Sequence, residues 1–447
     1  MALDIVVGVQ AGDEGKGLHV YRMAEQHDMV ARFNGGANAG HTNVYNGNKV
    51  ATHQVPSGIF YDDVSNLIGN GCLYDPVALF EKEKPELEGH GLAITPSRLA
   101  ISDTVHMVMP HDLFMDAIAE AGKGRQGSTV RGIRYVAADK YARIGVRAED
   151  IIEDPNGIYT KAFEGWEEAQ WRLQQAMAYI LDQDNGQETW EKLVARNFEE
   201  EFERWQAAAE YTVPFLVDGI SFINNALEEG KEILAEGAQS IGLDIEHGEY
   251  PLGTSSHATP AGALNGLGVS PEHVNNVYGI AKIFKSRVGG NGFPTQFSAD
   301  EKDIETRVRG TRNDKWGEYG ASTGRERDLG WFDLNDLRLA RSLGVKTIIL
   351  TKGDLVHLAG ETMKVADYHY LDGIKTTRTP SSAAKLARSK PHYVEVSTWG
   401  DEIQNARTRD QIPPAAQDFV DLVECETGLK VGIIGVGTEI DQFVAVH

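Results

Sequence analysis

The pattern of hydrophobic and polar positions predicts strands and helices that alternate along most of the chain. Short apolar runs predict buried strands, and they lie at residues 5–9, 64–76, 99–109, 233–239, 347–354 and 429–434. Helices are expected at 18–25, from about residue 77, and at 112–121. This alternation favours an α/β fold with a large, mainly parallel (mixed) central sheet and helices on both faces. Ligands are then expected at the carboxyl ends of the strands.

The stretch from residue 164 to 211 has a different pattern, because its apolar residues recur at helical spacing. It predicts two or more amphipathic helices packed on the sheet domain, with the tryptophans (Trp166, Trp171 and Trp190) in their core. Residues 182–186 begin like a calcium-binding loop but lack its final glutamate, so we expect a turn there. We therefore expect one domain over residues 1–447, with a helical subregion at 164–230.

Composition narrows the class of protein. Of the 447 residues, 41% are hydrophobic and 24% are charged, which is typical of a soluble globular protein. The net charge of −23 argues against binding to nucleic acid or to an anionic membrane. The chain lacks both a long apolar run and a basic, then hydrophobic, N-terminus, so neither a membrane span nor a secretory signal is indicated. We expect a cytoplasmic protein.

The two cysteines, Cys72 and Cys425, are too few for a disulfide framework or a zinc site. Neither belongs to a C-x-x-C pair. We expect both to be buried, reduced residues that fill space in the core.

The first predicted strand runs directly into the loop Gly-Asp-Glu-Gly-Lys-Gly at residues 12–17, called the glycine loop below. Glycines let backbone amides approach an anion, a following helix offers unpaired N–H groups, and Lys16 adds a positive charge. The common P-loop has Ser or Thr after its lysine to bind Mg²⁺, whereas Gly17 stands here, so Asp13 is the nearest candidate metal ligand. The loop indicates a phosphate-binding site; an ordinary strand-to-helix turn is the alternative.

Further segments combine glycine with polar side chains, as binding loops do. They are NGGANAGHT at 34–42, EGAQ at 236–239, an irregular stretch at 244–256 that ends in TSS, a segment with two closely spaced arginines at 318–333, and KGD at 352–354. Arg325 and Arg327 suit bidentate binding of carboxylates or phosphates. Residues 122–147 are rich in basic and small residues, for which a solvated face is an equal alternative.

These segments, in this order, resemble the adenylosuccinate synthetase family. The resemblance implies a ligase of purine biosynthesis that joins L-aspartate to inosine monophosphate (IMP) at the expense of GTP, with Mg²⁺ as cofactor. It implies small-molecule substrates, without nucleic acid or membrane partners. It also implies a homodimer in which Arg143 reaches into the neighbouring subunit's site.

The resemblance assigns roles to individual residues. Asp13 would remove the N1 proton of IMP so that its 6-oxygen attacks the γ-phosphate, His41 and Lys16 would assist the phosphoryl transfer, and aspartate would displace the phosphate from 6-phosphoryl-IMP. Asp13 and Gly40 would bind the metal. The residues matched to GTP are Gly12, Glu14, Gly15, Lys16, Gly17, Gly40, His41, Thr42, Lys352, Asp354, Gly435 and Gly437. Those matched to IMP are Asp13, Asn38, Thr129, Arg143, Gln239, Thr254, Arg325 and Arg327. Those matched to aspartate are Ser322, Thr323 and Arg325.

Several positions depart from the family's pattern. Leu18 and Tyr21 stand where a lysine and an aspartate commonly follow the glycine loop, and Gly353 stands where a leucine is expected. Glu326 interrupts a run of arginines, and residues 435–437 lack the serine and proline of the family's guanine-site turn. Gly353 and residues 435–437 concern the pocket for guanine and Glu326 that for aspartate, whereas Tyr21 is expected to change helix packing one turn from the glycine loop.

Two alternatives remain open at this point. A related viral reaction uses deoxyguanylate (dGMP) in place of IMP, with ATP or GTP as phosphoryl donor, and makes a 2-amino product. A regulatory GTP-binding protein that kept the fold and lost catalysis is the other alternative. Both enzymes would release phosphate in the presence of aspartate, whereas the regulatory protein would not, so this activity distinguishes them.

Overall fold

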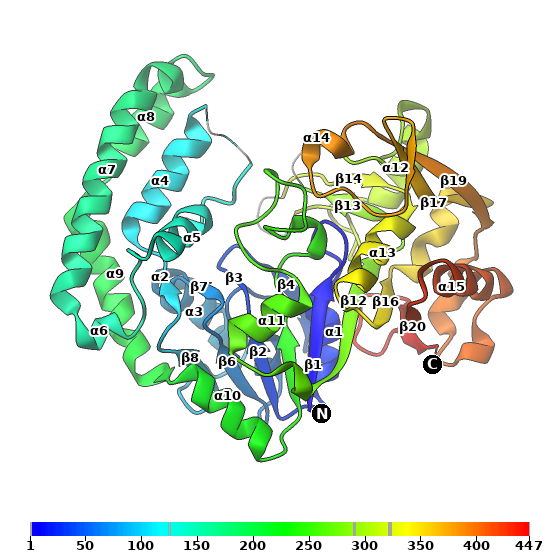
Figure 1. Cartoon of the computed structure of the whole chain (residues 1–447), viewed down its shortest axis with the longest axis horizontal. Helices are drawn as coiled ribbons and strands as arrows, with labels where there is room; N and C mark the ends of the chain where they lie inside the picture. The colour runs from blue at the N-terminus through cyan, green and yellow to red at the C-terminus, as the bar shows by residue number, and fades with distance from the viewer. Residues whose placement is uncertain (1, 124, 126, 289–291, 321–323, 447) are drawn as a thin grey trace.

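The computed structural model describes residues 2–123, 125, 127–288, 292–320 and 324–446, and a ten-stranded sheet lies at the centre of this part of the chain (Figure 1). The strand order is β10-β8-β6-β2-β11-β1-β12-β16-β20-β21, and every neighbouring pair is parallel except β20 and β21. The bounds are β1 Leu3–Gly8, β2 Met29–Arg32, β6 Ser65–Ile68, β8 Leu99–Ser102, β10 Leu216–Val217, β11 Ile233–Glu236, β12 Val274–Lys282, β16 Thr347–Thr351, β20 Lys430–Gly435 and β21 Phe443–Ala445. The predicted α/β fold with a mainly parallel sheet is confirmed.

Strand β1 lies near the middle of this sheet. All of its residues are buried, as expected of a parallel strand covered on both faces. It pairs with β11 on one side and β12 on the other, so segments that are more than 200 residues apart in sequence meet beside it. The covering helices include α1 Lys16–Ala24, α10 Gly219–Glu228, α11 Pro260–Leu267, α13 Leu334–Ser342 and α15 Pro414–Thr427. Helix α12 Lys302–Arg309 instead packs near β14 Asp328–Gly330.

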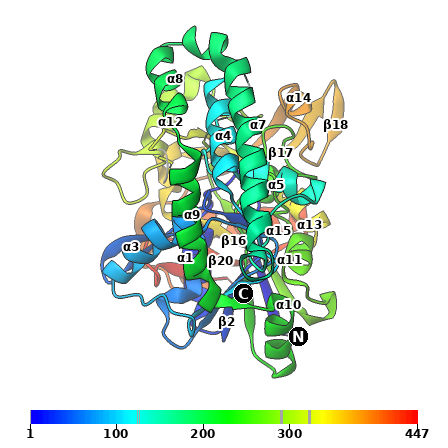
Figure 2. The ribbon, with the colours of Figure 1, turned by 90° about the vertical axis from the view of Figure 1, so that its left-hand side faces the viewer.

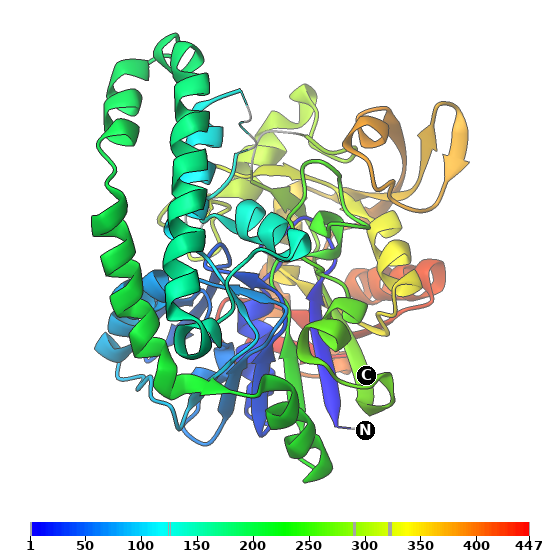
Figure 3. The ribbon, with the colours of Figure 1, turned by 60° about the vertical axis from the view of Figure 1, so that its left-hand side comes forward.

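A helical arm projects from one side of the sheet (Figures 2 and 3). It consists of α4 Pro110–Ala121, α6 Asp150–Glu153, α7 Pro155–Leu181, α8 Gly186–Val194 and α9 Phe198–Thr212, and α5 Ile133–Ala142 packs against α4 beside it. Helix α7 begins earlier than the hydrophobic pattern predicts, because the Asp154 side chain accepts a hydrogen bond from the backbone N of Gly157 (3.0 Å) and Pro155 occupies the first turn. The turn expected at 182–186 separates α7 from α8.

The tryptophans of this arm do not all lie in its core. Trp166 is buried, but Trp171 is 62% exposed, which corrects the expectation from the sequence. Five residues on a helix turn the side chain through about 140°, so a helix with one buried stripe directs Trp171 to the opposite side from Trp166.

A second, smaller sheet lies at the other end of the molecule, near the C-terminal third of the chain (Figure 1). It contains β15 Phe332–Asp333, β17 Thr362–Leu371, β18 Ile374–Thr376 and β19 Ser389–Ser397. The remaining strands are β3 Gly35–Gly36, β4 His41–Tyr45, β5 Asn48–Thr52, β7 Cys72–Tyr74, β9 His106–Met107, β13 Lys285–Arg287 and β14 Asp328–Gly330. The division into a single domain with a helical subregion stays a prediction.

The structure bears on two expectations from composition, the burial of the cysteines and the lack of a membrane span. Cys72 is buried as expected, but Cys425 is exposed on the outer side of α15, so the expectation of two buried cysteines is wrong for Cys425. Among the described residues, we find no helix that combines the length and apolar character needed to cross a membrane.

Candidate active site

The glycine loop connects the carboxyl end of β1 to α1 and folds around its own carboxylate. Gly12 and Gly15 have φ values of 96° and 94°, which side chains other than glycine disfavour. The Glu14 carboxylate is buried and accepts hydrogen bonds from the backbone N of Gln10 (3.1 Å) and Gly12 (2.9 Å). Glu14 therefore holds the loop from within, and it does not line the cavity described below.

The side chain of Lys16 is held beside this carboxylate. Its Nζ lies 2.8 Å from Glu14 Oε2 and 3.4 Å from Ser240 Oγ. Ser240 in turn donates to Glu14 (2.6 Å), and the favourable charge of Lys16 lowers the pKa of Glu14 although burial opposes this. The ammonium group is thus paired and oriented at the start of α1.

Gly17 explains why this loop differs from a common P-loop. A Cβ atom at position 17 would lie 2.6 Å from the Cβ of His41 and 3.0 Å from its Cα. The hydroxyl-bearing residue of a P-loop is therefore excluded here by the close approach of strand β4. The same contact places His41 directly beside the glycine loop.

His41 belongs to a buried polar network centred on Glu236, the last residue of β11. The Glu236 carboxylate accepts from Arg32 Nη1 (3.2 Å), from the backbone N of Ser57 (2.7 Å) and from Ser57 Oγ (2.8 Å), and it is also hydrogen-bonded to His41 Nδ1. Both Arg32 and Glu236 are at most 1% exposed. The network fixes the imidazole ring so that its Nδ1 faces Glu236.

The charges of this network are well defined at neutral pH. Burial would raise the pKa of Glu236, but Arg32 and then His41 lower it to about 2, so Glu236 is ionised. Burial, followed by the positive charge of Arg32, lowers the pKa of His41 to about 4. His41 is therefore neutral, and its Nδ1–H donates to Glu236, which leaves Nε2 as an acceptor.

A second cluster of charges lies around Asp13. Asp13 has φ 58°, an uncommon conformation for a residue other than glycine, and its carboxylate is 35% exposed. Arg327 Nη2 lies 2.8 Å from Asp13 Oδ2, and Arg327 Nη1 donates to Glu318 (2.7 Å). Arg327 thus connects the carboxylate of the glycine loop to the segment that follows residue 318.

Glu318 forms ion pairs with two lysines in addition to Arg327. Lys282 Nζ lies 2.9 Å from Glu318 Oε2, and Lys352 Nζ pairs with Oε1 of the same carboxylate while donating to the carbonyl of Trp316 (2.8 Å). Burial lowers the pKa of Lys282 to about 8, and the neighbouring lysine and arginine add to this effect. Lys282, and then Lys352, hold the pKa of the buried Glu318 well below its usual range.

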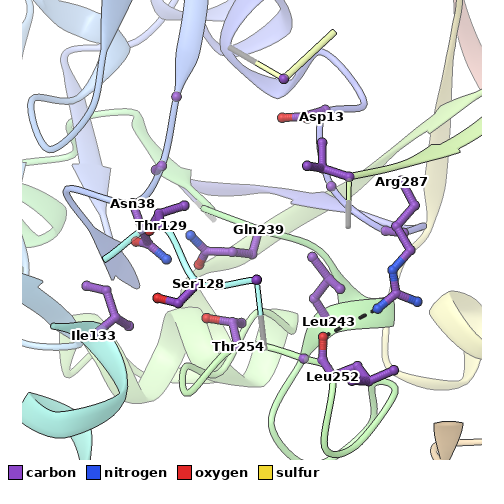
Figure 4. Close-up of a pocket in the computed structure, with 18 of the residues that line it drawn as sticks. Asp13, Asn38, Ser128, Thr129, Ile133, Gln239, Leu243, Leu252, Thr254 and Arg287 are labelled. Carbon is purple, nitrogen blue, oxygen red and sulfur yellow. Dashed lines mark hydrogen bonds between the residues drawn. The ribbon is translucent and has the colours of Figure 1, made fainter. Parts of the chain in front are cut away.

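Asp13, Lys16, His41 and Arg327 line one cavity of about 580 Å³. Figure 4 shows part of its lining. The residues predicted from the sequence that line it are Gly12, Asp13, Gly15, Lys16, Gly17, Asn38, Gly40, His41, Thr42, Thr129, Gln239, Thr254 and Arg327. They come from the loops after β1 and β11, from residues 38–42 between β3 and the start of β4, and from the segments near residues 129, 254 and 327. The cavity is large enough for a nucleotide-sized ligand.

Thr129 reaches the cavity on a loop that α4 holds in place. Asp116 of α4 accepts from Ser128 Oγ (2.9 Å) and from the backbone N of Gly132 (3.0 Å). Between them Val130 has φ 54°, a strained conformation for a β-branched residue. Figure 4 shows Thr129 and Ser128 on the same side of the cavity as Asn38.

The residues matched to guanine lie outside the lining of this cavity. Thr351 at the end of β16 donates to the carbonyl of Glu14 (3.0 Å), so Lys352 and Asp354 follow a strand tied to the glycine loop. Asp354 is buried, and burial raises its pKa. Gly435 ends the neighbouring strand β20, and Gly437 follows it two residues later.

Position 353 has a steric reason to be glycine. A Cβ there would lie 2.6 Å from Cγ2 of Ile434 and 3.2 Å from the carbonyl oxygen of Gly435. Trp399 Nε1 also donates to the Gly353 carbonyl (2.6 Å). The loops after β16 and β20 thus approach so closely that the family's leucine does not fit this backbone.

The other predicted residues have different surroundings. Arg143 is exposed at the end of α5 with φ 63°, and Arg325 is exposed next to the cavity-lining segment. Ser322 and Thr323 lie outside the described residues. Of the departures, Tyr21 packs on Phe60 with ring centroids 4.7 Å apart, in an aromatic cluster beside α1, and Leu18 is partly buried.

Sequence reasoning did not assign roles to Glu236, Arg32, Glu318 or Lys282. Glu236 and Glu318 each begin a segment that the pattern marked as polar, but their partners lie far away in sequence: 195 residues separate His41 from Glu236. Glu236 could have been singled out because it is a carboxylate at the end of a predicted buried strand, and a buried carboxylate needs a partner.

The donor set suits a magnesium ion. Mg²⁺ prefers hard oxygen ligands and is usually bound by one or two carboxylates together with substrate phosphates. The Asp13 carboxylate and residue Gly40, whose carbonyl is an oxygen donor, line the same cavity as Lys16. These residues fit the metal expected from the sequence.

Comparison with known proteins places these features in one family. A family model described as adenylosuccinate synthetase matches residues 5–444. The chain is 37% identical over 454 residues to the adenylosuccinate synthetase of Clostridium perfringens (strain 13 / Type A), covering 100% of this chain and 99% of the relative. It is 39% identical over 446 residues to that of Clostridium botulinum (strain 657 / Type Ba4), covering 99% and 98%.

Two solved structures resemble the fold. The fully ligated adenylosuccinate synthetase from Plasmodium falciparum superposes with a TM-score of 0.82 at 28% identity, covering 100% of both chains. The succinoaminodeoxyadenylate synthetase of cyanophage S-2L, bound to dGMP and dATP, gives a TM-score of 0.59 at 16% identity and covers 100% of this chain and 95% of the other. The second likeness concerns the fold alone.

Proposed function

The chain belongs to the adenylosuccinate synthetase family, and from that premise we propose that it joins L-aspartate to IMP through a 6-phosphoryl-IMP intermediate. As a member of this family it is a ligase that uses GTP and Mg²⁺. The observation that carries the proposal is that Asp13, Lys16 and His41 line one cavity with the residues matched to IMP.

Asp13 is the base of the first step. It takes the N1 proton of IMP while the 6-oxygen forms a bond to the γ-phosphorus of GTP and the bond from that phosphorus to the β-phosphate oxygen breaks. Arg327, 2.8 Å from Asp13, supports this role because the ion pair holds the carboxylate in a defined orientation. Lys16 lies at the same loop and offers its charge to the phosphates when it leaves Glu14.

His41 orients and then donates to the transferred phosphoryl group. In the ligand-free network it is neutral, with Nδ1–H directed to Glu236. A phosphoryl group beside Nε2 adds negative charge, which favours the protonated imidazole, so both nitrogens then donate. Glu236 is therefore a positioning residue: it holds the ring and stabilises the imidazolium.

Thr129, Asn38, Gln239 and Thr254 would bind the purine nucleotide, because they surround one side of the cavity. Asp13 and Gly40 would hold Mg²⁺, which neutralises phosphate charge when bound. Asp354, with Lys352, is the proposed guanine contact. The nearby backbone at Gly435 and Gly437 would close that pocket.

In the second step the amine of aspartate attacks C6 and phosphate leaves with the oxygen. Ser322, Thr323 and Arg325 are the proposed contacts of the aspartate carboxylates, since an arginine on a short polar loop suits bidentate binding. We also propose a cytoplasmic homodimer in which Arg143 enters the partner's cavity. Its exposure at the end of α5 supports this assignment.

The test is phosphate release by purified protein with Mg²⁺ and aspartate, in which IMP or dGMP is crossed with GTP or ATP. Aspartate-dependent turnover with IMP and GTP, abolished in Asp13→Asn, is expected. Asn keeps the size of the side chain and cannot accept the N1 proton. Turnover with dGMP alone would refute the proposed substrate, and phosphate release without aspartate would refute ligation.

A further inference from the structure

Helix α4 of the arm and the neighbouring α5 bring a histidine and two aspartates together, away from the cavity. His111 and Asp112 lie in the first turn of α4, and Asp139 lies on α5. His111 Nε2 is 3.4 Å from Asp139 Oδ2 and 3.9 Å from Asp112 Oδ1, and the three ligand atoms all lie within 4.8 Å of one another. None of these residues lines the active-site cavity.

Helix α7 fixes the position of the imidazole. A Cβ atom at Gly165 would lie 2.6 Å from Cγ and from Cδ2 of His111, so the glycine leaves the space that the ring occupies. The ring is consequently held against the backbone of α7 while Nε2 is directed towards Asp139. The imidazole is preorganised, whatever binds to it.

The carboxylate of Asp112 is incompletely satisfied. Its Oδ2 accepts from the backbone N of Met109 (2.8 Å), as an N-terminal helix cap does. Its Oδ1 is buried without a hydrogen-bond partner, and the side chain is only 1% exposed. A buried polar atom without a partner costs free energy, and this one faces the His111 ring nitrogen and the carboxylate of Asp139.

We propose that His111, Asp112 and Asp139 form a binding site for one divalent transition-metal ion of the Zn²⁺ or Co²⁺ type. Bond lengths of about 2.0–2.2 Å in a tetrahedral site separate ligand atoms by about 3.3–3.6 Å. The 3.4 Å between His111 and Asp139 matches this separation, and a small rotation of Asp112 brings its Oδ1 to the same distance. Asp139 is half-buried, so a water molecule can complete the coordination from the solvent side.

The donor set distinguishes this site from the magnesium site of the proposed reaction. One imidazole with two carboxylates suits zinc and cobalt, whereas Mg²⁺ prefers oxygen ligands and retains several waters. The inference therefore does not depend on the proposed function. It concerns a different place in the fold and a different class of metal.

Metal binding here would join α4 to α5. Asp116, one turn along α4, already holds the loop that carries Thr129, and α5 begins where that loop ends and is followed by Arg143. A bound ion would thus hold together both ends of the segment that contributes these two residues. The expected consequence is a more stable arm.

The experiment uses the full chain, stripped of metal with a chelator, without nucleotide and with excess Mg²⁺ to occupy oxygen-only sites. Co²⁺ is titrated and its visible absorption recorded, and Zn²⁺ is then added in competition. We expect one Co²⁺ per chain, with the intensity of a tetrahedral site, displaced by Zn²⁺. Zn²⁺ should also raise the melting temperature of the chelator-treated protein.

Variants locate the ion. His111→Gln and Asp139→Asn should each weaken Co²⁺ binding roughly tenfold or more, as the loss of a ligand does. The matched control is His27→Gln, because His27 also pairs with an aspartate (Asp4, 3.4 Å) but, among the described residues, belongs to no group of three potential metal ligands. Circular dichroism confirms that each variant is folded. Asp139→Asn should disturb the core least, because Asp139 is half-buried.

Three results would overturn the proposal. The first is the absence of Co²⁺ or Zn²⁺ binding to the wild-type chain at micromolar concentrations. The second is binding that both His111→Gln and Asp139→Asn leave unchanged, since the ion then lies elsewhere. The third is an octahedral Co²⁺ spectrum lost equally in His27→Gln. None of these results bears on whether the chain ligates aspartate to IMP.

Discussion

Replacing His41 by asparagine should remove one defined part of the dependence of stability on pH between about pH 7.5 and pH 5. The unfolded chain has an ordinary histidine, with a pKa of 6.5, whereas burial and Arg32 lower the pKa of His41 to about 4 in the folded protein. Below about pH 6.5 the unfolded chain therefore binds a proton that the folded chain does not. The free energy of unfolding must fall as the pH falls.

The size of the effect follows from these two pKa values. Linkage gives a loss of about 2 kcal/mol of the free energy of unfolding between about pH 7.5 and pH 5 from this one residue. Glu236, whose pKa is lowered to about 2, contributes stability that is lost mainly below its unfolded value of 4.5. The chosen pH range therefore reports on His41 with little contribution from Glu236.

The assay is urea-induced unfolding, followed by tryptophan fluorescence at both pH values, for the wild type and for His41→Asn. Other groups titrate in both proteins, so the difference between the two pH-dependent losses isolates His41. His392→Asn, which changes a surface histidine, is the control and should behave as the wild type. Equal losses in wild type and His41→Asn would show that His41 binds a proton as readily in the folded as in the unfolded chain, and would refute the lowered pKa of His41.

Three substitutions test other parts of the site. Glu236→Gln leaves the buried Arg32 without its counter-charge and should lower the free energy of unfolding by about 3–5 kcal/mol. Urea unfolding at neutral pH measures this, and a loss below about 1 kcal/mol would contradict the network. Gly17→Ser restores the P-loop hydroxyl, but its Cβ would lie 2.6 Å from His41 Cβ, so kcat should fall rather than rise, and retained turnover would contradict the steric argument. Gly353→Leu should lower stability by about 1–3 kcal/mol through overpacking against Ile434, and Ile434→Ala in the same chain should recover part of the loss in thermal melts.

Much of the fold follows from local patterns in the sequence. The strand β1 and the glycine loop after it are predictable because a continuous apolar run is typical of a strand covered on both faces, and because glycines mark the turn. The helices of the arm between residues 164 and 211 follow from helical spacing of apolar residues. Their bounds do not, since the start of α7 depends on the cap at Asp154.

The candidate site was predictable only in part, for a physical reason. Motifs identify residues whose chemistry is evident locally, such as Lys16 and Asp13. The partners that set their charge, such as Glu318 and Glu236, are brought close by the order of strands in the sheet, and no local spacing encodes that order. The same holds for Gly353, whose need for a small residue arises from a neighbouring strand.

The cations of the site are matched by carboxylates of the protein itself: Lys16 by Glu14, Arg327 by Asp13 and Glu318, and Lys352 by Glu318. Any anionic ligand must therefore exchange with an internal counter-ion before it gains a full contact. A small anion such as inorganic phosphate gains few contacts to offset one exchange, whereas a nucleoside triphosphate reaches several of these positions at once. Self-neutralisation thus acts as a filter that favours long polyanions over the abundant small anions of the cell.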